Sequence, residues 1–281
     1  MLNRRVWTRQ PQVAVGVDWS NPLTRGLIVA SSPGLFGGRN AVDGGRLVVQ
    51  TATASKVTKF GVALDQQAGA NSAYFPANIP SGTTTYTLIT IAGALFLDKR
   101  FAIALGDEVS GGSAQARLVL NGVQSGGTLL GKLAFIEYGG GFHVQVETSA
   151  ATYVDPVDPP NPHIYGVVRN GADAAIWFDG SKVASNSSAS GSSTFAQRVY
   201  VSGSGYSNTV YLDQSVAAFA WLRALTDKEI VSVMGNPWQL FAPLSRPVFA
   251  PSAASAFPVL SNPTMTSLTS TTGYPRVDVT W

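Results

Sequence analysis

The stretch YLDQSVAAFAWLRALTDKEIVSVMGNPWQLFAP, residues 211–243, decides the fold, because a strand pattern in it changes abruptly into one short helix. Phe219 and Trp221 fit a buried strand that leads into a turn. Thr226 then stands where a helix N-cap belongs, with acidic residues in the first turn and apolar residues at helical spacing behind it. Pro237 forbids continuation of the helix. The sequence therefore predicts a strand, one capped helix of about two turns and an aromatic-rich exit.

The rest of the chain has the composition of a folded β protein. Its 281 residues are 45% hydrophobic and only 12% charged, so the chain can bury a large core. The 29 glycines and 16 prolines supply the turn chemistry that many short strands need. A continuous apolar run at residues 85–97, TYTLITIAGALFL, predicts a central strand that is buried on both faces.

Two motifs carry a resemblance to a known family. One is the exit NPWQLF at residues 236–241, and the other is HIYGVVRNGADAAIWFDGSKVAS at residues 163–185, which reads as strands joined by Asn-Gly and Asp-Gly turns. The chain resembles the laminin-G-like, concanavalin-A-like jelly-roll domains of virion proteins from tailed bacteriophages and prophages. The resemblance covers residues 19–241. It implies an all-β jelly-roll β-sandwich with extended terminal arms and one short C-terminal helix, packed against the sandwich edge.

The chain divides into four predicted parts: an N-terminal arm at 1–18, the sandwich at 19–241, a Pro/Ser-rich linker at 242–258 and a C-terminal strand arm at 259–281. In this last part Val277, Val279 and Trp281 alternate with polar residues. A lone strand cannot satisfy its own edge, so it must return to its own sandwich or pair with another subunit. Resemblance to phage fibres and decorations favours the second option, a homo-oligomer and specifically a trimer, with these three side chains at the assembly contact.

Composition and charge argue against several classes of protein. The net charge is only +3 and no window concentrates Lys and Arg, so no nucleic-acid partner is expected. The absence of cysteine excludes a disulfide scaffold and a thiolate zinc site. No apolar segment approaches the roughly 20 residues that span a bilayer, and no apolar region follows the N-terminal charges, so neither membrane insertion nor a secretory signal is expected. Assembly in a host cytoplasm, followed by residence in a virion, fits this pattern, and an ordinary cytosolic protein fits it equally.

The search for catalytic groups is mostly negative. Glutamate occurs at four positions only, and the closely spaced carboxylates of glycosidases on this jelly roll are missing. Glu137 and Glu147 would have to meet across a hairpin, about 5 Å apart, to form a retaining pair. The favoured interpretation is that both are solvent-facing strand residues. His143 and His163 without any cysteine do not predict a structural zinc site. No enzyme activity is therefore expected.

Surface aromatics are the remaining candidates for a binding site. Flat rings stack on the apolar faces of sugars, while amides and acids around them orient the hydroxyl groups. The candidate ligand-binding residues are Tyr153, Asn161, Tyr206, Asn208, Tyr211 and Asp213. Packing in the core or in hairpins is the alternative interpretation of these residues.

A calcium site is the one metal hypothesis that the sequence offers. Asp155 and Asp158 lie in a proline-rich loop, and calcium takes oxygen ligands of this kind. The favoured interpretation is that both are turn formers that precede proline, so no cofactor is expected.

The resemblance implies a non-enzymatic structural protein of a tailed-phage virion. In the favoured role it is an adhesion module of the tail tip, fibre or baseplate that contacts host-surface glycans and other virion proteins. The alternative is a head decoration or cement protein that binds no sugar. A glycan-cleaving enzyme is disfavoured by the missing carboxylate pair.

Overall fold

The computed structural model describes residues 10–49, 54–58, 61–65, 73–93, 99–106, 115–121, 132–138, 142–149, 162–191, 198–202, 214–244, 264–271 and 274–280. The chain divides into two compact units, Met1–Leu244 and Ser245–Trp281.

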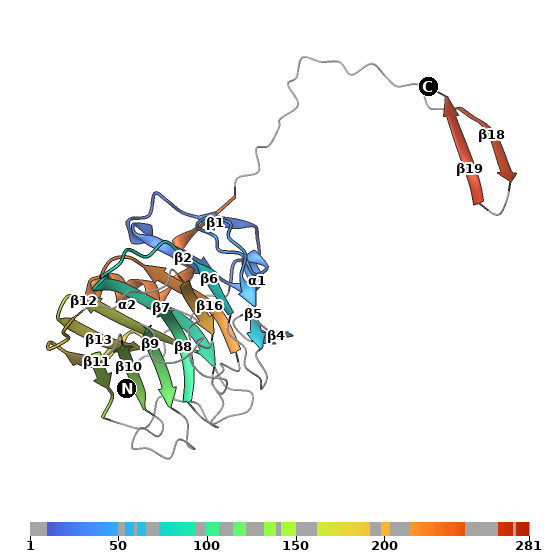
Figure 1. The fold of residues 1–281 in the computed structure, drawn as a ribbon. Coiled ribbons are helices and arrows are strands. Elements are labelled where there is room, and N and C mark those ends of the chain that lie inside the picture. The colour runs from blue at the N-terminus through green and yellow to red at the C-terminus, as the bar shows by residue number, and fades with distance from the viewer. Residues whose placement is uncertain are drawn as a thin grey trace. The chain divides into compact units, whose positions relative to one another are not determined.

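Two large antiparallel sheets form most of the described part of the first unit (Figure 1). One sheet has, in spatial order, β11 (Phe142–Glu147), β10 (Leu133–Tyr138), β9 (Gln115–Asn121), β8 (Lys99–Gly106), β15 (Arg198–Ser202), β6 (Ala73–Pro76) and β3 (Val48–Val49). The other has β14 (Ser181–Asn186), β13 (Asp173–Phe178), β12 (His163–Asn170), β7 (Thr85–Gly93), β16 (Gln214–Trp221), β5 (Gly61–Asp65) and β4 (Ala54–Thr58), with β2 (Leu27–Ser31) also paired to β16. We call these the seven-stranded and the eight-stranded sheet. The predicted all-β sandwich is confirmed.

The central strands of the eight-stranded sheet are buried on both faces. Every residue of β16 is buried, as is every residue of β7 after Thr85. One core fills the space between the sheets, and a second core lies on the outer face of the eight-stranded sheet. The prediction of a central strand buried on both faces is therefore confirmed for β7.

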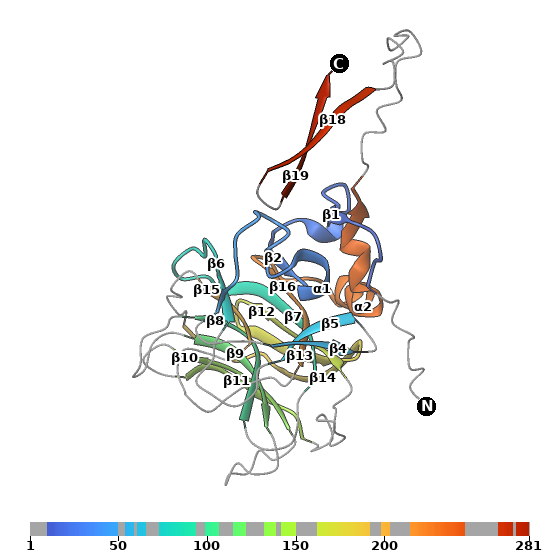
Figure 2. The same ribbon diagram turned by 90° about the vertical axis from the view of Figure 1, so that its right-hand side faces the viewer.

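Helix α2 (Asp227–Gly235) covers part of that outer face. Thr226 caps it as predicted, because its hydroxyl accepts from the Glu229 amide at 3.3 Å while the Glu229 carboxylate accepts from the Thr226 amide at 2.8 Å. Ile230 and Met234 are buried against Phe219 and its neighbours. The helix lies on the face of the sheet and not at the sandwich edge, since the apolar outer face of β16 and β7 needs cover. Figure 2 shows α2 and the short helix α1 (Pro33–Phe36) on the side away from the seven-stranded sheet.

The N-terminal segment completes this cover. Strand β1 (Val15–Val17) pairs with β17 (Phe241–Pro243), and the 3-10 turn η1 (Pro22–Thr24) follows it. The Trp221 indole donates to the Leu23 carbonyl at 2.8 Å, which ties the turn to β16. Another 3-10 turn, η2 (Pro237–Leu240), leads from α2 into β17.

The C-terminal unit contains an antiparallel hairpin. Strand β18 (Thr264–Thr271) pairs with β19 (Tyr274–Thr280), with Thr264 opposite Thr280 and Thr271 opposite Tyr274. The expectation of a lone strand is wrong, because the preceding Thr/Ser-rich segment is itself a strand and supplies a partner within the arm. In the part of the chain that the structure describes, no helix is long and apolar enough to cross a membrane.

Candidate functional site

A cleft of about 610 Å³ opens on the outer face of the eight-stranded sheet, where α2 leaves β12, β13 and β14 uncovered. Its volume lies within the range of about 300–1,000 Å³ that is typical of small-molecule sites. Strand residues form its floor, and the segment that enters α2 forms one wall. The lining residues are Val168, Asn170, Asp173, Ala174, Ala175, Trp177, Lys182, Ser185, Asn186, Ser187, Ala224, Leu225, Thr226 and Asp227.

The floor of the cleft is hollow because small side chains lie beside one large ring. On β13 the side chains of Ala174 and Ile176 belong to the core between the sheets, so Ala175 and Trp177 point to the outer face. Ala175 lies opposite Val168 on β12 and opposite Ser185 on β14. This row of small and medium side chains leaves room next to the indole of Trp177.

The wall of the cleft is held by hydrogen bonds to the sheet. The Leu225 amide donates to the Thr87 hydroxyl at 2.9 Å, and that hydroxyl donates to the Arg223 carbonyl at 2.9 Å. Arg223 also forms an ion pair with Glu229 at 2.9 Å. The Arg223 hydrogen bond lowers the pKa of Glu229 below its ordinary value, an effect that partial burial opposes. The first turn of α2 is therefore fixed relative to β7.

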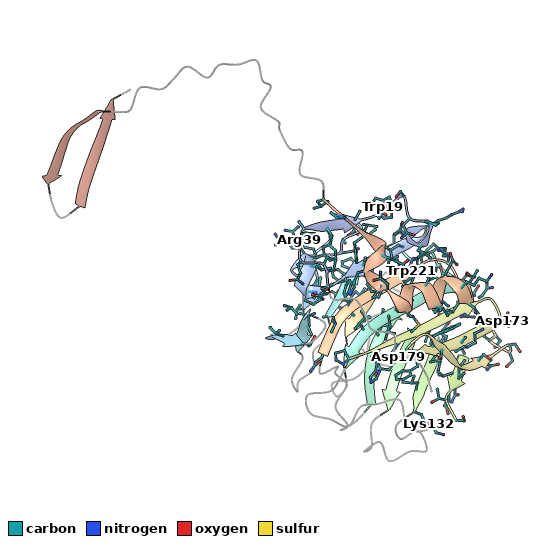
Figure 3. All side chains as sticks on the ribbon, turned by 180° about the vertical axis from the view of Figure 1, so that it is seen from behind. Trp19, Arg39, Lys132, Asp173, Asp179 and Trp221 are labelled. Carbon is teal, nitrogen blue, oxygen red and sulfur yellow. The ribbon has the colours of Figure 1, made fainter. Side chains whose placement is uncertain are left out.

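Charged and aromatic groups meet at the mouth of the cleft. The Lys182 ammonium lies 5.2 Å from the centroid of the Trp177 ring and 2.7 Å from the Asp227 carboxylate, so it bridges β14 and α2. Asp173 is exposed at the start of β13, the end opposite Asp179, as Figure 3 shows. The Trp177 side chain is 4% exposed, and its Nε1–H donates to no partner among the residues that the structure describes. A buried donor without a partner costs free energy that an acceptor can recover.

The sequence-predicted binding residues fall on segments that the structure does not describe. Tyr153, Asn161, Tyr206, Asn208, Tyr211 and Asp213, and the calcium candidates Asp155 and Asp158, all lie outside the described residues. Of the assembly residues, Val277 and Val279 belong to β19, and Trp281 lies outside the described part of the chain.

Trp177 is the aromatic residue of the cleft that the sequence analysis did not single out. It lies in the hairpin motif that carried the family resemblance, at alternating positions with Asp173 and Ala175. That alternation places the three on one face of a strand, which could have been noted. Only the structure shows that α2 stops short of them.

Glu137 is buried, and the expectation that it faces solvent is wrong. Its side chain is 0% exposed, its Oε2 accepts from the Tyr86 hydroxyl at 2.6 Å, and it forms an ion pair with Arg169, which is 1% exposed. Burial first, and the charge of Glu137 second, raise the pKa of Tyr86 well above its usual range. Glu137 lies opposite Val144 while Glu147 lies opposite Ala134, so the two carboxylates point to opposite faces of the sheet and do not form a pair.

The His163 imidazole forms a contact of a structural kind. Its Nδ1 lies 2.7 Å from the Asp179 carboxylate, and its ring packs on Phe178 with 5.0 Å between centroids. The other carboxylate oxygen of Asp179 accepts from the Ile164 amide at 3.0 Å, which fixes the turn after β13. Among the described residues, no three His, Asp or Glu side chains are grouped so that they could hold a metal ion.

Comparisons with known proteins identify the fold. No family model matches the sequence, and no curated protein matches it either. Domain 4 of AbnA, a GH43 extracellular arabinanase from Geobacillus stearothermophilus solved with arabinotriose, aligns with a TM-score of 0.56 at 10% identity, over 74% of this chain and 98% of that one. The binding domain of Paraclostridial Mosquitocidal Protein 1 aligns with a TM-score of 0.52 at 14% identity, over 75% of this chain and 52% of that one.

A third structure, the binding domain of botulinum neurotoxin DC in complex with SialylT, aligns with a TM-score of 0.51 at 10% identity, over 75% of this chain and 52% of that one. The chain thus spans about half the length of the two toxin domains (52%). The TM-scores show that the fold is shared, and identities this low show nothing beyond the fold, so function has to be argued from the chemistry of the site.

Proposed function

We propose that this chain is a non-enzymatic adhesion module that binds host-surface glycans in the cleft over Trp177. We further propose that it belongs to the virion of a tailed phage, at the tail tip, fibre or baseplate, after assembly in the host cytoplasm. The observation that carries the glycan proposal is the cleft itself, in which an indole with an unpartnered N–H lies among polar side chains on a rigid sheet.

The chemistry of the cleft suits a short oligosaccharide. Sugars present apolar C–H faces and many hydroxyl groups, so a site for them needs an aromatic surface together with donors and acceptors. The part of the Trp177 ring that borders the cleft supplies apolar contact, Asp173 supplies a carboxylate acceptor, and Asn170 supplies an amide that both donates and accepts. The Asn186 amide already donates to Gln145 and accepts from Ser188, which fixes its orientation at the cleft. The structural neighbours solved with arabinotriose and with SialylT lend support, since this jelly roll serves as a binding domain in other proteins.

The absence of catalysis is part of the proposal. The one pair of glutamates that the sequence offered for retaining hydrolysis points to opposite faces of its sheet. Within the cleft, Asp227 is already engaged by Lys182, so Asp173 would act without a second free carboxylate. This arrangement favours binding over bond cleavage.

Assembly through the C-terminal arm is also proposed. The hairpin of β18 and β19 forms a unit separate from the sandwich, which suits docking onto another copy of the chain in a trimer or onto other virion proteins by strand addition. The same arm would suit a head decoration protein without sugar binding, which is the second candidate. We propose no bound cofactor.

A glycan array followed by calorimetry tests the binding proposal. The wild-type chain is compared with Ser185→Trp, which fills the cleft from its floor, and with Val57→Trp, which adds the same ring at a side chain that is 83% exposed on edge strand β4. We expect the cleft variant to lose at least tenfold in affinity and the control to bind like the wild type. Equal binding by all three proteins, or no glycan bound by the wild type, would refute the assignment.

Electron microscopy with an antibody against the chain tests its place in a virion. Labelling of phage tails supports the adhesion role, and labelling of heads supports the decoration role. Phage particles that lack the chain altogether would refute both.

A further inference from the structure

Three charged side chains line the cleft, and two of them neutralise each other. Lys182 and Asp227 form an ion pair of 2.7 Å across the mouth. Asp173 lines the same cleft, and no ion pair engages it among the described residues. Asn170 and Asn186, which also line the cleft, carry no charge. The side chains that a ligand meets therefore sum to one negative charge.

This balance is unfavourable for an acidic ligand. A carboxylate or sulfate on a sugar could enter near Asp173, where it meets a like charge. It could also take the ammonium of Lys182 from Asp227, but Asp227 would then lose its partner, so one ion pair is exchanged for another. Neither route gains net electrostatic attraction.

An uncharged sugar meets a complementary site. Its hydroxyl groups can donate to Asp173 and accept from the amide of Asn170 or Asn186. No charged group of the cleft has to lose its partner.

We infer that this cleft selects uncharged glycans over acidic ones, and that Asp173 is the residue that sets this specificity. The inference rests on the proposed glycan binding and adds the ligand class to it. Two unit charges about 4 Å apart in water repel by about 1 kcal/mol, which is about fivefold in affinity. The preference is largest at low salt, since the screening length shortens from about 30 Å at 0.01 M to about 8 Å at 0.15 M.

The test uses pairs of oligosaccharides that differ only in a terminal sialic acid, or only in oxidation of one hexose to a uronic acid. Affinities of the full-length protein for each pair are measured by calorimetry at about 0.01 M and 0.15 M salt. We expect the wild type to prefer the neutral member at least fivefold at low salt and less at high salt. Asp173→Asn, which keeps the shape and removes the charge, should reduce the preference to below twofold.

The matched control is Asp43→Asn, the same change at an exposed carboxylate that does not line the cleft. It should keep the full preference for neutral glycans. Equal or tighter binding of the acidic members by the wild type, or an unchanged preference in Asp173→Asn, would overturn the inference while the glycan-binding function stands. Failure of the wild type to bind either member of any pair would overturn the proposed function, and the inference with it.

Discussion

Removing the carboxylate of Glu137 should destabilise the sandwich more than almost any other polar substitution. Glu137 on β10 accepts from the Tyr86 hydroxyl on β7 and pairs with Arg169 on β12, so it joins the two sheets through the core. Arg169 also donates to the carbonyls of Gly191 at 2.5 Å and Gly171 at 3.2 Å. In Glu137→Leu the guanidinium keeps these two contacts but remains buried without a counter-charge.

The expected loss of unfolding free energy is about 3–5 kcal/mol, the usual cost of removing one partner from a buried ion pair. At about 2–4 °C for each kcal/mol in a domain of this size, the melting temperature should fall by about 6–20 °C. The double variant Glu137→Leu/Arg169→Met should recover most of the loss. Apolar replacement of both partners is often neutral, because neither charge is then taken out of water.

Equilibrium unfolding in urea, followed by circular dichroism, measures these changes provided that the m-value stays constant. Lys182→Met serves as the control, since it breaks a pair whose side chains are 40% and 67% exposed and should cost no more than about 1 kcal/mol. A loss below about 1 kcal/mol in Glu137→Leu would refute the reasoning. A double variant as unstable as the sum of the two single variants would refute it equally.

Three further outcomes follow. Because burial and Glu137 raise the pKa of Tyr86, the folded chain keeps a proton that the unfolded chain loses above about pH 10. The free energy of unfolding should therefore fall as the pH rises beyond that value, and it should fall less in Tyr86→Phe. Equal urea midpoints at pH 9 and 11 in the wild type would contradict this. Because Arg223 lowers the pKa of Glu229, the stabilising effect of that carboxylate is present above its ordinary pKa of 4.5 and is lost as the pH falls through the lowered value. Glu229→Gln should therefore flatten the acid limb of a plot of unfolding free energy against pH. An acid limb that stays the same in the variant would argue against this role. Deletion of residues 245–281 should convert the proposed oligomer to a monomer in light scattering while the circular dichroism of the sandwich persists, and an unchanged mass would show that the arm plays no part in assembly.

The sequence was most informative where local chemistry decides the structure. The apolar run of β16, the cap at Thr226 and the stop at Pro237 depend on neighbours within a few residues, and each prediction from them is confirmed. The prediction that α2 packs against the sandwich edge is wrong, because the helix lies on the outer face of the eight-stranded sheet. Its position depends on which faces of β7 and β16 remain uncovered, and these strands come from distant parts of the chain.

The misses share one physical cause, which is dependence on pairing between distant segments. An acid in a strand is normally exposed, and the approach of Arg169 and Tyr86 from the other sheet makes burial of Glu137 tolerable. Trp177 looked like any strand aromatic, because the cleft beside it exists only where the segment that enters α2 forms a wall next to Ala175 and Ser185 and leaves them uncovered. The strand at 264–271 lacked an apolar alternation, yet its pairing with the last strand supplies the hydrogen bonds that a single edge would lack.

The segment that decides the fold also builds the proposed site. Residues 224–227 leave β16, form one wall of the cleft and start α2, and they are held by the Thr87 hydroxyl and by the ion pair of Arg223 with Glu229. A wall that is already ordered loses little conformational freedom when a ligand arrives, so weak contacts to a few hydroxyl groups can yield measurable affinity. Single sugar sites of this kind bind modestly, and several copies held together by the C-terminal arm would multiply that affinity without any new contact. Under the proposed function the two parts act together: the sandwich supplies the glycan site, and the proposed assembly through the arm supplies avidity.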